Sequence, residues 1–398
     1  MSCEANYGRC TGKLRGVYVT MKLCSLVGIV STNPKCRAYK MYVLFLIVGS
    51  IAAWIHSAYE KNHNMFGKYT IYMLIADQIS SFFLCMATVA VSITSVFLFP
   101  EKFLQTVQSL RNFDRILGIS CPLELKHYLI FFGLGHLLIL IPIMFDAWTW
   151  ISNLGFRFYS IYVIRNIQYY QLSVILFLWF WLAMEVIKRF KILNAILEKV
   201  VVSPYILLNT DLKRGRYSNC VDVFKMEEKI KNISGLYNGV CDVVDLMNDV
   251  FGKGLLFIII FIISFILTYM ILLIIYISFP INGVELSKNS PVVSGVWILE
   301  NFIKIMALAS AGENLSREAN RTITVCYGII NTLDNNPQYN VDAIKEELNF
   351  LIQQAAHRKP CLSASGFFVA NSTMMGFIIG SITSYVIVAV QFLKETSP

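Results

Sequence analysis

Charged or amide side chains lie inside several long apolar stretches of this sequence. Asp77 and Gln78 lie in one stretch, Arg165 in another, and Glu300 and Lys304 in a third. A charge away from water is costly unless an opposite charge or a water-filled space is close. Glu300 precedes Lys304 by four residues, a spacing at which oppositely charged side chains on a helix can pair. Asp77 and Arg165 could form a second pair, and the pairs either join helices or mark a functional site.

The residues that usually carry catalysis or metal binding are not arranged for either. The five histidines, His56, His63, His127, His136 and His357, form no cluster with the spacing of metal ligands. The sequence also contains no glycine-rich phosphate loop and no nucleophile elbow. We therefore expect no enzyme activity, no catalytic residue, no metal site and no cofactor.

Seven apolar stretches dominate the sequence and must position these side chains. They run approximately over 39–59, 71–99, 127–150, 162–184, 254–279, 292–311 and 366–393. Each is near or above the ~20 residues with which a helix crosses a bilayer. With 56% hydrophobic and 15% charged residues, the composition favours membrane helices over the core of a soluble protein. The sequence predicts an all-α membrane protein with seven transmembrane helices.

The basic residues indicate how the helices are oriented. Of the 34 Lys and Arg residues, 27 lie in alternate segments that include the N-terminal one, if Lys40 is counted there, and 5 lie in the other segments. The positive-inside rule then places the N-terminus in the cytosol and the C-terminus outside. Nine of the ten cysteines fall on the cytosolic side and Cys85 lies in a span, so no outer disulfide is expected. The net charge of +9 faces anionic lipid, and no nucleic-acid partner is expected.

Helical periodicity continues outside the spans. Apolar positions from Asp222 onward run into the fifth span, which predicts one helix as far as Phe279. The fourth span continues to a break at Pro204, and Val341–Ala356 forms an amphipathic helix with Asn340 as its N-cap. Apolar stripes in water need a partner, so we expect a cytosolic helical bundle that packs within one subunit or between subunits.

The expected organisation divides the chain into seven segments. These are 1–38 (cytosolic N-terminal segment), 39–184 (spans one to four), 185–253 (cytosolic helical extension), 254–311 (spans five and six), 312–365 (cytosolic loop with the amphipathic helix), 366–393 (last span) and 394–398 (extracellular tail). The last span differs from the others because small or polar residues dominate one narrow stripe of it: Thr373, Phe377, Gly380, Ser384, Val388 and Gln391. Such a stripe either packs closely on another helix or lines a pore in which Phe377 and Val388 are constrictions.

The end of the last span resembles a known signature. Residues 383–392 read Thr-Ser-Tyr-Val-Ile-Val-Ala-Val-Gln-Phe, which is similar to the Thr-Tyr, five hydrophobic residues, Gln-Phe pattern of insect gustatory receptors. Ser384 stands where that family usually has Thr, so the hydroxyl group is retained. The seven spans, the cytosolic N-terminus and the long loop between spans four and five also match the family.

The resemblance implies a tetrameric, ligand-gated, nonselective cation channel in the plasma membrane of chemosensory neurons. Its partners would be a small-molecule tastant, further copies of the chain or related receptor subunits, membrane lipid and cations. The helix Val341–Ala356 would belong to a cytosolic anchor domain that joins subunits. The last span would line the pore, and the implied pore and gate residues are Phe377, Ser384, Tyr385, Val388, Gln391 and Phe392.

The family binds ligands among the outer halves of spans two, three, four and six. Aromatic, charged and hydrogen-bonding residues that fall there are Asp77, Gln78, Asp146, Trp148, Tyr162, Arg165, Tyr169, Trp297, Glu300, Asn301 and Lys304. This mixture suits stacked sugars and bulky alkaloids alike. Sugar-responsive members commonly have Glu directly after the motif Tyr, whereas this chain has Val386, which favours a bitter or other non-sugar ligand.

Two other functions fit parts of the sequence. An insect odorant receptor channel subunit would share the inverted seven-span architecture, but the Gln-Phe ending argues against it. A secondary transporter would have two related halves with broken helices, and the sequence shows no such internal repeat.

Overall fold

The structure is a computed structural model that describes residues 15–30, 35–65, 71–118, 125–212, 219–278, 290–334 and 342–395. Within these residues, seven helices are long and apolar enough to cross a membrane. They are α3 (Arg37–Met65), α4 (Ile71–Ser92, continued by the π-helix η2, Ile93–Leu98), α6 (Leu125–Leu154), α8 (Val163–Leu212), α9 (Asn219–Ser278), α10 (Ser290–Asp334) and α12 (Ser372–Glu395). The predicted all-α fold with seven spans is confirmed.

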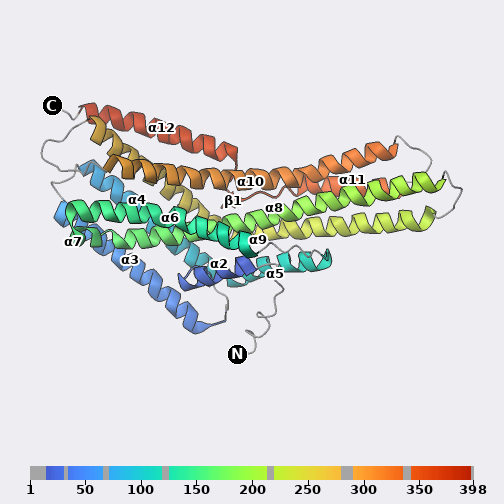
Figure 1. Cartoon of the computed structure of the whole chain (residues 1–398), viewed down its shortest axis with the longest axis horizontal. Helices are drawn as coiled ribbons and strands as arrows, with labels where there is room; N and C mark the ends of the chain where they lie inside the picture. The colour runs from blue at the N-terminus through green and yellow to red at the C-terminus, as the bar shows by residue number, and fades with distance from the viewer. Residues whose placement is uncertain are drawn as a thin grey trace.

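The seven helices differ in how far they are covered by the rest of the chain. A helix can cross a bilayer because all its backbone groups pair within the helix, and its side chains then face either lipid or protein. In α8, 67% of the residues in the apolar stretch of the helix are buried by the rest of the chain, whereas in α3 and α12 only 17% are buried. The helix α8 is therefore central, and α3 and α12 lie at the periphery (Figure 1).

Three of the spanning helices continue far beyond the membrane part. The helix α9 has 60 residues and is about 90 Å long, against ~30 Å for the hydrocarbon core. The ends of α8, α9 and α10, together with α11 (Asp342–His357), form what we call the extension (Figure 1). The predicted continuous helix into the fifth span is confirmed, and its glycines do not interrupt it.

The helix α11 buries its apolar stripe within its own chain. Ile344, Leu348, Leu351, Ile352 and Ala355 are all buried, and α11 packs against α9 and α10. Of the two alternatives left open by the sequence, packing within one subunit accounts for this stripe. Asn340 and Val341 lie outside the described residues.

Several predicted helix boundaries differ from the structure, among them the break at Pro204 and the start of the last span. The helix α8 continues past Pro204 to Leu212, so the predicted break there is wrong. A proline interrupts helical hydrogen bonding only locally. The last span begins at Ser372 and not at Gly366, because residues before it form a hairpin of β1 (Ser363–Ala364) and β2 (Phe368–Val369). Gly366 has a φ of +80° in the turn, a conformation that favours glycine.

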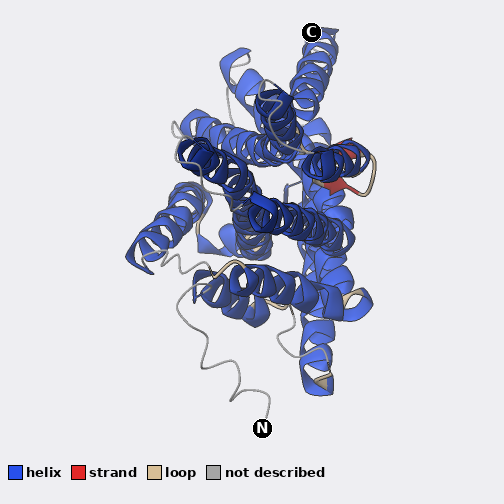
Figure 2. Ribbon diagram, turned by 90° about the vertical axis from the view of Figure 1, so that its right-hand side faces the viewer, coloured by secondary structure: helices blue, strands red, loops and turns tan. Residues whose placement is uncertain are grey.

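Among the described residues, three further helices were not predicted. The helix α5 (Pro100–Ile116) starts with a proline and packs its apolar face against α9. The helix α2 (Arg15–Leu26) packs against α8 and α6, and α7 (Phe156–Ser160) is a short turn between α6 and α8. Viewed from the end of the molecule that carries the extension, most helices run toward the viewer and the two strands lie at the edge of the bundle (Figure 2).

Candidate functional site

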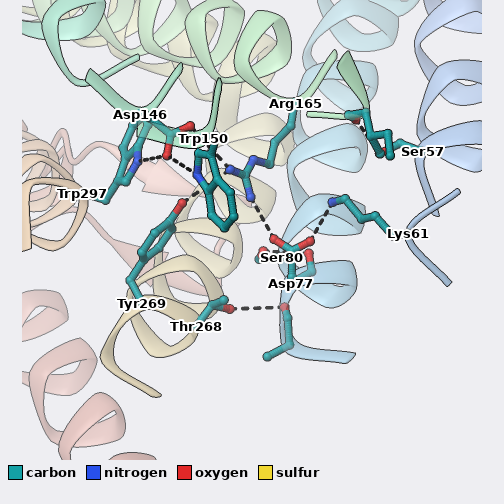
Figure 3. A network of polar contacts seen from close by, with 12 residues as sticks. Ser57, Lys61, Asp77, Ser80, Asp146, Trp150, Arg165, Thr268, Tyr269 and Trp297 are labelled. Carbon is teal, nitrogen blue, oxygen red and sulfur yellow. Dashed lines mark hydrogen bonds and ion pairs between the residues drawn. The ribbon is translucent and has the colours of Figure 1, made fainter. Parts of the chain in front are cut away.

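One carboxylate joins three spanning helices at the end of the bundle opposite the extension. Asp77 of α4 accepts a hydrogen bond from Nζ of Lys61 on α3 at 2.6 Å and another from Nη1 of Arg165 on α8 at 2.8 Å (Figure 3). The side chains of Lys61 and Arg165 are 2% and 7% exposed. Because buried charges are stable only with partners, these ion pairs hold α3, α4 and α8 together.

A second carboxylate extends this network to α6 and α10. Oδ1 of Asp146 accepts hydrogen bonds from the indole nitrogens of Trp150 at 3.0 Å and Trp297 at 3.2 Å. Nη2 of Arg165 lies 3.9 Å from Oδ2 of Asp146 and donates to the hydroxyl of Tyr269 on α9 at 3.4 Å. Figure 3 shows these side chains converging from different helices, so six of the spans share one polar network, which we call the outer network.

Aromatic rings surround the outer network. The rings of Trp150 and Tyr162 stack at 5.5 Å, and Tyr169 meets Trp297 edge to face at 4.7 Å. The guanidinium of Arg165 lies 4.8 Å from the centre of the Tyr162 ring. These cation–π and edge-to-face contacts add packing energy to the ion pairs, and they place flat surfaces beside hydrogen-bonding groups.

A second ion pair lies deeper in the membrane part. Nζ of Lys304 lies 2.7 Å from Oε1 of Glu300, one helical turn away on α10, and it donates to Oγ of Ser173 on α8 at 2.7 Å. The hydroxyl of Tyr169 donates to the other oxygen of Glu300, and Nδ2 of Asn301 donates to the Tyr169 hydroxyl at 3.1 Å. We call Glu300 and Lys304 the inner pair. Tyr169 therefore connects the inner pair to the aromatic rings of the outer network.

A cavity lies beside the inner pair. It has a volume of about 170 Å³ and is formed by α6, α8 and α10. Its polar residues are Ser173, Glu300 and Lys304, and the rest of its wall is apolar. A cavity with this lining accepts a ligand that is mainly apolar with one polar end.

The structure brings most of the predicted binding residues together. Asp77, Tyr162, Arg165, Tyr169, Trp297, Glu300, Asn301 and Lys304 belong to the outer network or the inner pair. Two do not. Gln78 turns toward α3 and donates to Oδ1 of Asn62 at 2.8 Å, and Trp148 is 57% exposed beside Phe145. The sequence missed Lys61 and Tyr269, although a single basic residue shortly after an apolar stretch is a signal that could have found Lys61.

The stripe predicted on the last span faces away from the chain's own helices. Phe377 is 56% exposed and Val388 44%, and Thr373, Gly380, Ser384 and Gln391 are exposed as well. Tyr385, which is not part of the stripe, is 61% exposed. The face of α12 that holds the buried residues Met374, Ile378 and Ile382 packs on α9 and α10. Phe392 belongs to the helix, but its side chain lies outside the described ones.

The hairpin that joins α11 to α12 is bound to two spanning helices. Nδ2 of Asn248 on α9 donates to the carbonyl oxygen of Cys361 at 2.8 Å, and its Oδ1 accepts from the backbone nitrogen of Ser363 at 2.9 Å. On α10, a β-carbon at Gly312 would overlap the carbonyl oxygen of Ala370. The start of the last span is therefore held in close contact with both α9 and α10.

The family model described as "7tm Chemosensory receptor" matches residues 14–395. The chain belongs to this chemosensory receptor family. Two solved structures of the insect olfactory receptor OR5 from Machilis hrabei have the same fold. The complex with eugenol gives a TM-score of 0.57 at 10% identity and covers 95% of this chain and 98% of that chain. The other gives 0.58 at 8% identity and covers 95% and 97%. A search of curated proteins found no match.

These comparisons connect the fold to a class of membrane receptor. The resemblance that the sequence carries in residues 383–392 is confirmed as far as the chemosensory receptor family. The likeness to OR5 extends over almost the whole of both chains, so the extension and the last span belong to the shared fold. The outer network and the inner pair are consequently features of a chemosensory receptor.

Proposed function

We propose that this receptor is a gustatory receptor that acts as a ligand-gated, nonselective cation channel. Four copies would surround a central pore in the plasma membrane of chemosensory neurons, either alone or with related subunits. The observation that carries the proposal is the exposed face of α12, which holds small and polar residues although the helix has the length of a span. Polar groups are costly in lipid, so a water-filled pore lined by several copies of this face accounts for them.

The pore assignment concerns six residues on or next to this face. Phe377, Ser384, Tyr385, Val388, Gln391 and Phe392 are proposed to form the pore wall and the gate. Because the other face of α12 packs on α9 and α10, a shift of these two helices changes the position of α12. We expect a ligand to favour one such position, by no more than its difference in affinity for the two states.

The ligand is proposed to bind at the outer network, in contact with Trp297, Tyr169 and their neighbours. Oδ2 of Asp146 and Oδ1 of Asn301 are buried and have no hydrogen-bond partner among the described residues. A ligand that carries N–H or O–H donors would satisfy these acceptors, while its apolar part stacks on the aromatic rings. The solved OR5 complex with eugenol supports a small-molecule ligand. Val386 favours a bitter or other non-sugar compound.

Whole-cell recording from a null cell that expresses this chain alone tests the proposal. A panel of plant alkaloids and sugars is perfused while G-protein signalling is blocked. We expect a cation current evoked by at least one alkaloid and by none of the sugars. If the protein is at the cell surface and neither it nor its co-expression with related subunits gives a current, the channel proposal is wrong.

Substitutions on α12 test the pore assignment with a matched control. Val388 and Ile379 are both β-branched and are 44% and 42% exposed, but nine residues place them on opposite faces of the helix. Val388→Trp and Gln391→Leu should each change the conductance without changing the amount of receptor at the cell surface. Ile379→Trp should leave the conductance unchanged. Unaltered currents in both Val388→Trp and Gln391→Leu would show that α12 does not line the pore.

An odorant receptor subunit is the alternative within the same family. The Tyr385 to Gln391 motif favours the gustatory assignment. Activation by volatile compounds that requires a co-expressed receptor subunit, together with silence toward tastants, would favour the alternative.

A further inference from the structure

The chain carries positive charge without negative charge where it enters the first span. Residues 5–59 contain no Asp or Glu, whereas residues 13–40 contain six Lys or Arg residues. Of these, Lys22, Lys35 and Arg37 are exposed and Lys40 is half-buried. We call these four residues the basic surface. The predicted orientation places the basic surface at the cytosolic leaflet, which carries the anionic lipids.

On both helices of the basic surface, an exposed apolar residue follows a basic residue after one helical turn. On α2, Leu26 follows Lys22 and is 69% exposed. On α3, Met41 follows Arg37 and is 65% exposed. Residues four positions apart lie on the same face of a helix. A phospholipid has the same order, because its charged headgroup lies at the membrane surface and its acyl chains lie below the headgroup.

Hydrogen bonds hold the end of α2 against two spanning helices. The hydroxyl of Tyr42 on α3 donates to the carbonyl oxygen of Leu26 at 2.6 Å. Nε2 of Gln171, inside the predicted fourth span, donates to the carbonyl oxygen of Val27 at 3.4 Å. Leu26 therefore lies beside the first turns of α3 at the edge of the membrane part, and Lys22 lies one turn closer to the start of α2.

We propose that the basic surface binds the headgroup of a phosphoinositide in the cytosolic leaflet, with an acyl chain along Leu26 and Met41. Several phosphates on one headgroup match four basic side chains better than the single net charge of phosphatidylserine does. The positive end of the α3 dipole, at Arg37, adds to this attraction. A headgroup that contacts both helices holds α2 in its position against α6 and α8.

Photolabelling of the purified receptor in nanodiscs tests the proposal. The nanodiscs contain phosphatidylcholine and a phosphatidylinositol bisphosphate whose acyl chain carries a diazirine, and the labelled segments are mapped by mass spectrometry. We expect labels on α2 and on the first two turns of α3. When competitors are compared at equal total charge, phosphatidylinositol bisphosphate should displace the probe about tenfold more effectively than phosphatidylserine, because its phosphates contact several basic side chains at once.

Two double substitutions that remove the same charge provide the matched control. Arg37→Gln with Lys40→Gln changes the basic surface. Lys229→Gln with Lys231→Gln changes two exposed residues of α9, about 35 Å along the helix from the start of the predicted fifth span. The first variant should reduce labelling of α2 and α3 about tenfold, and the second should leave it unchanged.

Equal displacement of the probe by the two lipids would show only a general attraction between basic residues and anionic lipid, and would overturn the proposal. Equal labelling of the two variants would overturn it as well. The displacement measurement uses the unmodified receptor, so it decides the question even if Arg37→Gln with Lys40→Gln does not fold.

Discussion

At the scale of single residues, Asp77 is a shared partner, because its one carboxylate pairs with both Lys61 and Arg165, which belong to different helices. Asp77→Asn should lower stability by about 3 kcal/mol or more, since it leaves two buried cations facing each other. The thermal unfolding midpoint of the detergent-solubilised receptor, followed by tryptophan fluorescence, measures this loss.

A second substitution separates the charge effect from a packing effect. Lys61→Met in the Asp77→Asn background should recover part of the loss, because Arg165 then has only Asp146 to face and no second cation. Lys102→Gln removes an ion pair with Asp249 whose side chains are 36% and 48% exposed, and it should change stability by less than about 1 kcal/mol. A stable Asp77→Asn variant would mean that the pairs contribute nothing measurable.

The residue types predicted some of these contacts and not others. The pairs of Glu300 with Lys304 and of Asp77 with Arg165 follow from the rule that charges in a membrane need partners. Lys61 was missed because the first apolar stretch ends at Tyr59, which places Lys61 in a loop, whereas α3 continues to Met65. Composition could not reveal this, because the helix extends through a polar segment, and the ion pair of Lys61 with Asp77 depends on a different helix.

At the scale of elements, the contact between the hairpin and α10 depends on Gly312. Gly312→Ala should push the backbone at Ala370 away from α10, and overpacking of this kind costs about 1–3 kcal/mol. Because Ser372 at the start of α12 donates to Glu313 at 3.2 Å, the displacement should also alter the ligand-evoked current. Thermal unfolding of the solubilised receptor and the dose–response curve in cells measure the two effects.

Gly295 offers a control on the same helix. A β-carbon at Gly295 meets nothing within 4 Å, so Gly295→Ala should leave the structure intact and improve stability by up to ~1 kcal/mol through helix propensity. Similar behaviour of the two alanine variants would indicate that the hairpin moves aside at no cost and does not hold the last span.

Helices were easier to predict than the hairpin for a physical reason. An apolar pattern that continues without interruption into the fifth span predicted α9, because apolar positions three and four residues apart share one face of a helix. The hairpin between α11 and α12 has strands of two residues each, and its position depends on Asn248 of α9, far away in the sequence. The face of α6 that turns toward α8 was equally hidden, which is why Trp148 was predicted in the site and lies outside it.

At the scale of the whole molecule, charge and cysteine placement indicate the same orientation. The basic residues concentrate on the side of the extension, and the described cysteines Cys24, Cys36, Cys85, Cys241, Cys326 and Cys361 are all free. Burial raises the pKa of the thiols of Cys24 and Cys361 and keeps them protonated. Free thiols are typical of a reducing compartment, so the extension should lie in the cytosol.

Epitope tags at the two ends of the chain test this orientation. A C-terminal tag should be stained by antibody in intact cells, whereas an N-terminal tag should be stained only after permeabilisation, because the positive-inside rule places the two ends on opposite sides. The four Asn-x-Ser/Thr triplets, which start at Asn232, Asn314, Asn320 and Asn371, should then remain unglycosylated and serve as an internal control. If the N-terminal tag is stained in intact cells and these triplets carry glycans, the orientation of the receptor is the reverse of the predicted one. The extension would then lie outside, and Gln391 would be at the cytosolic end of α12, which contradicts the predicted orientation.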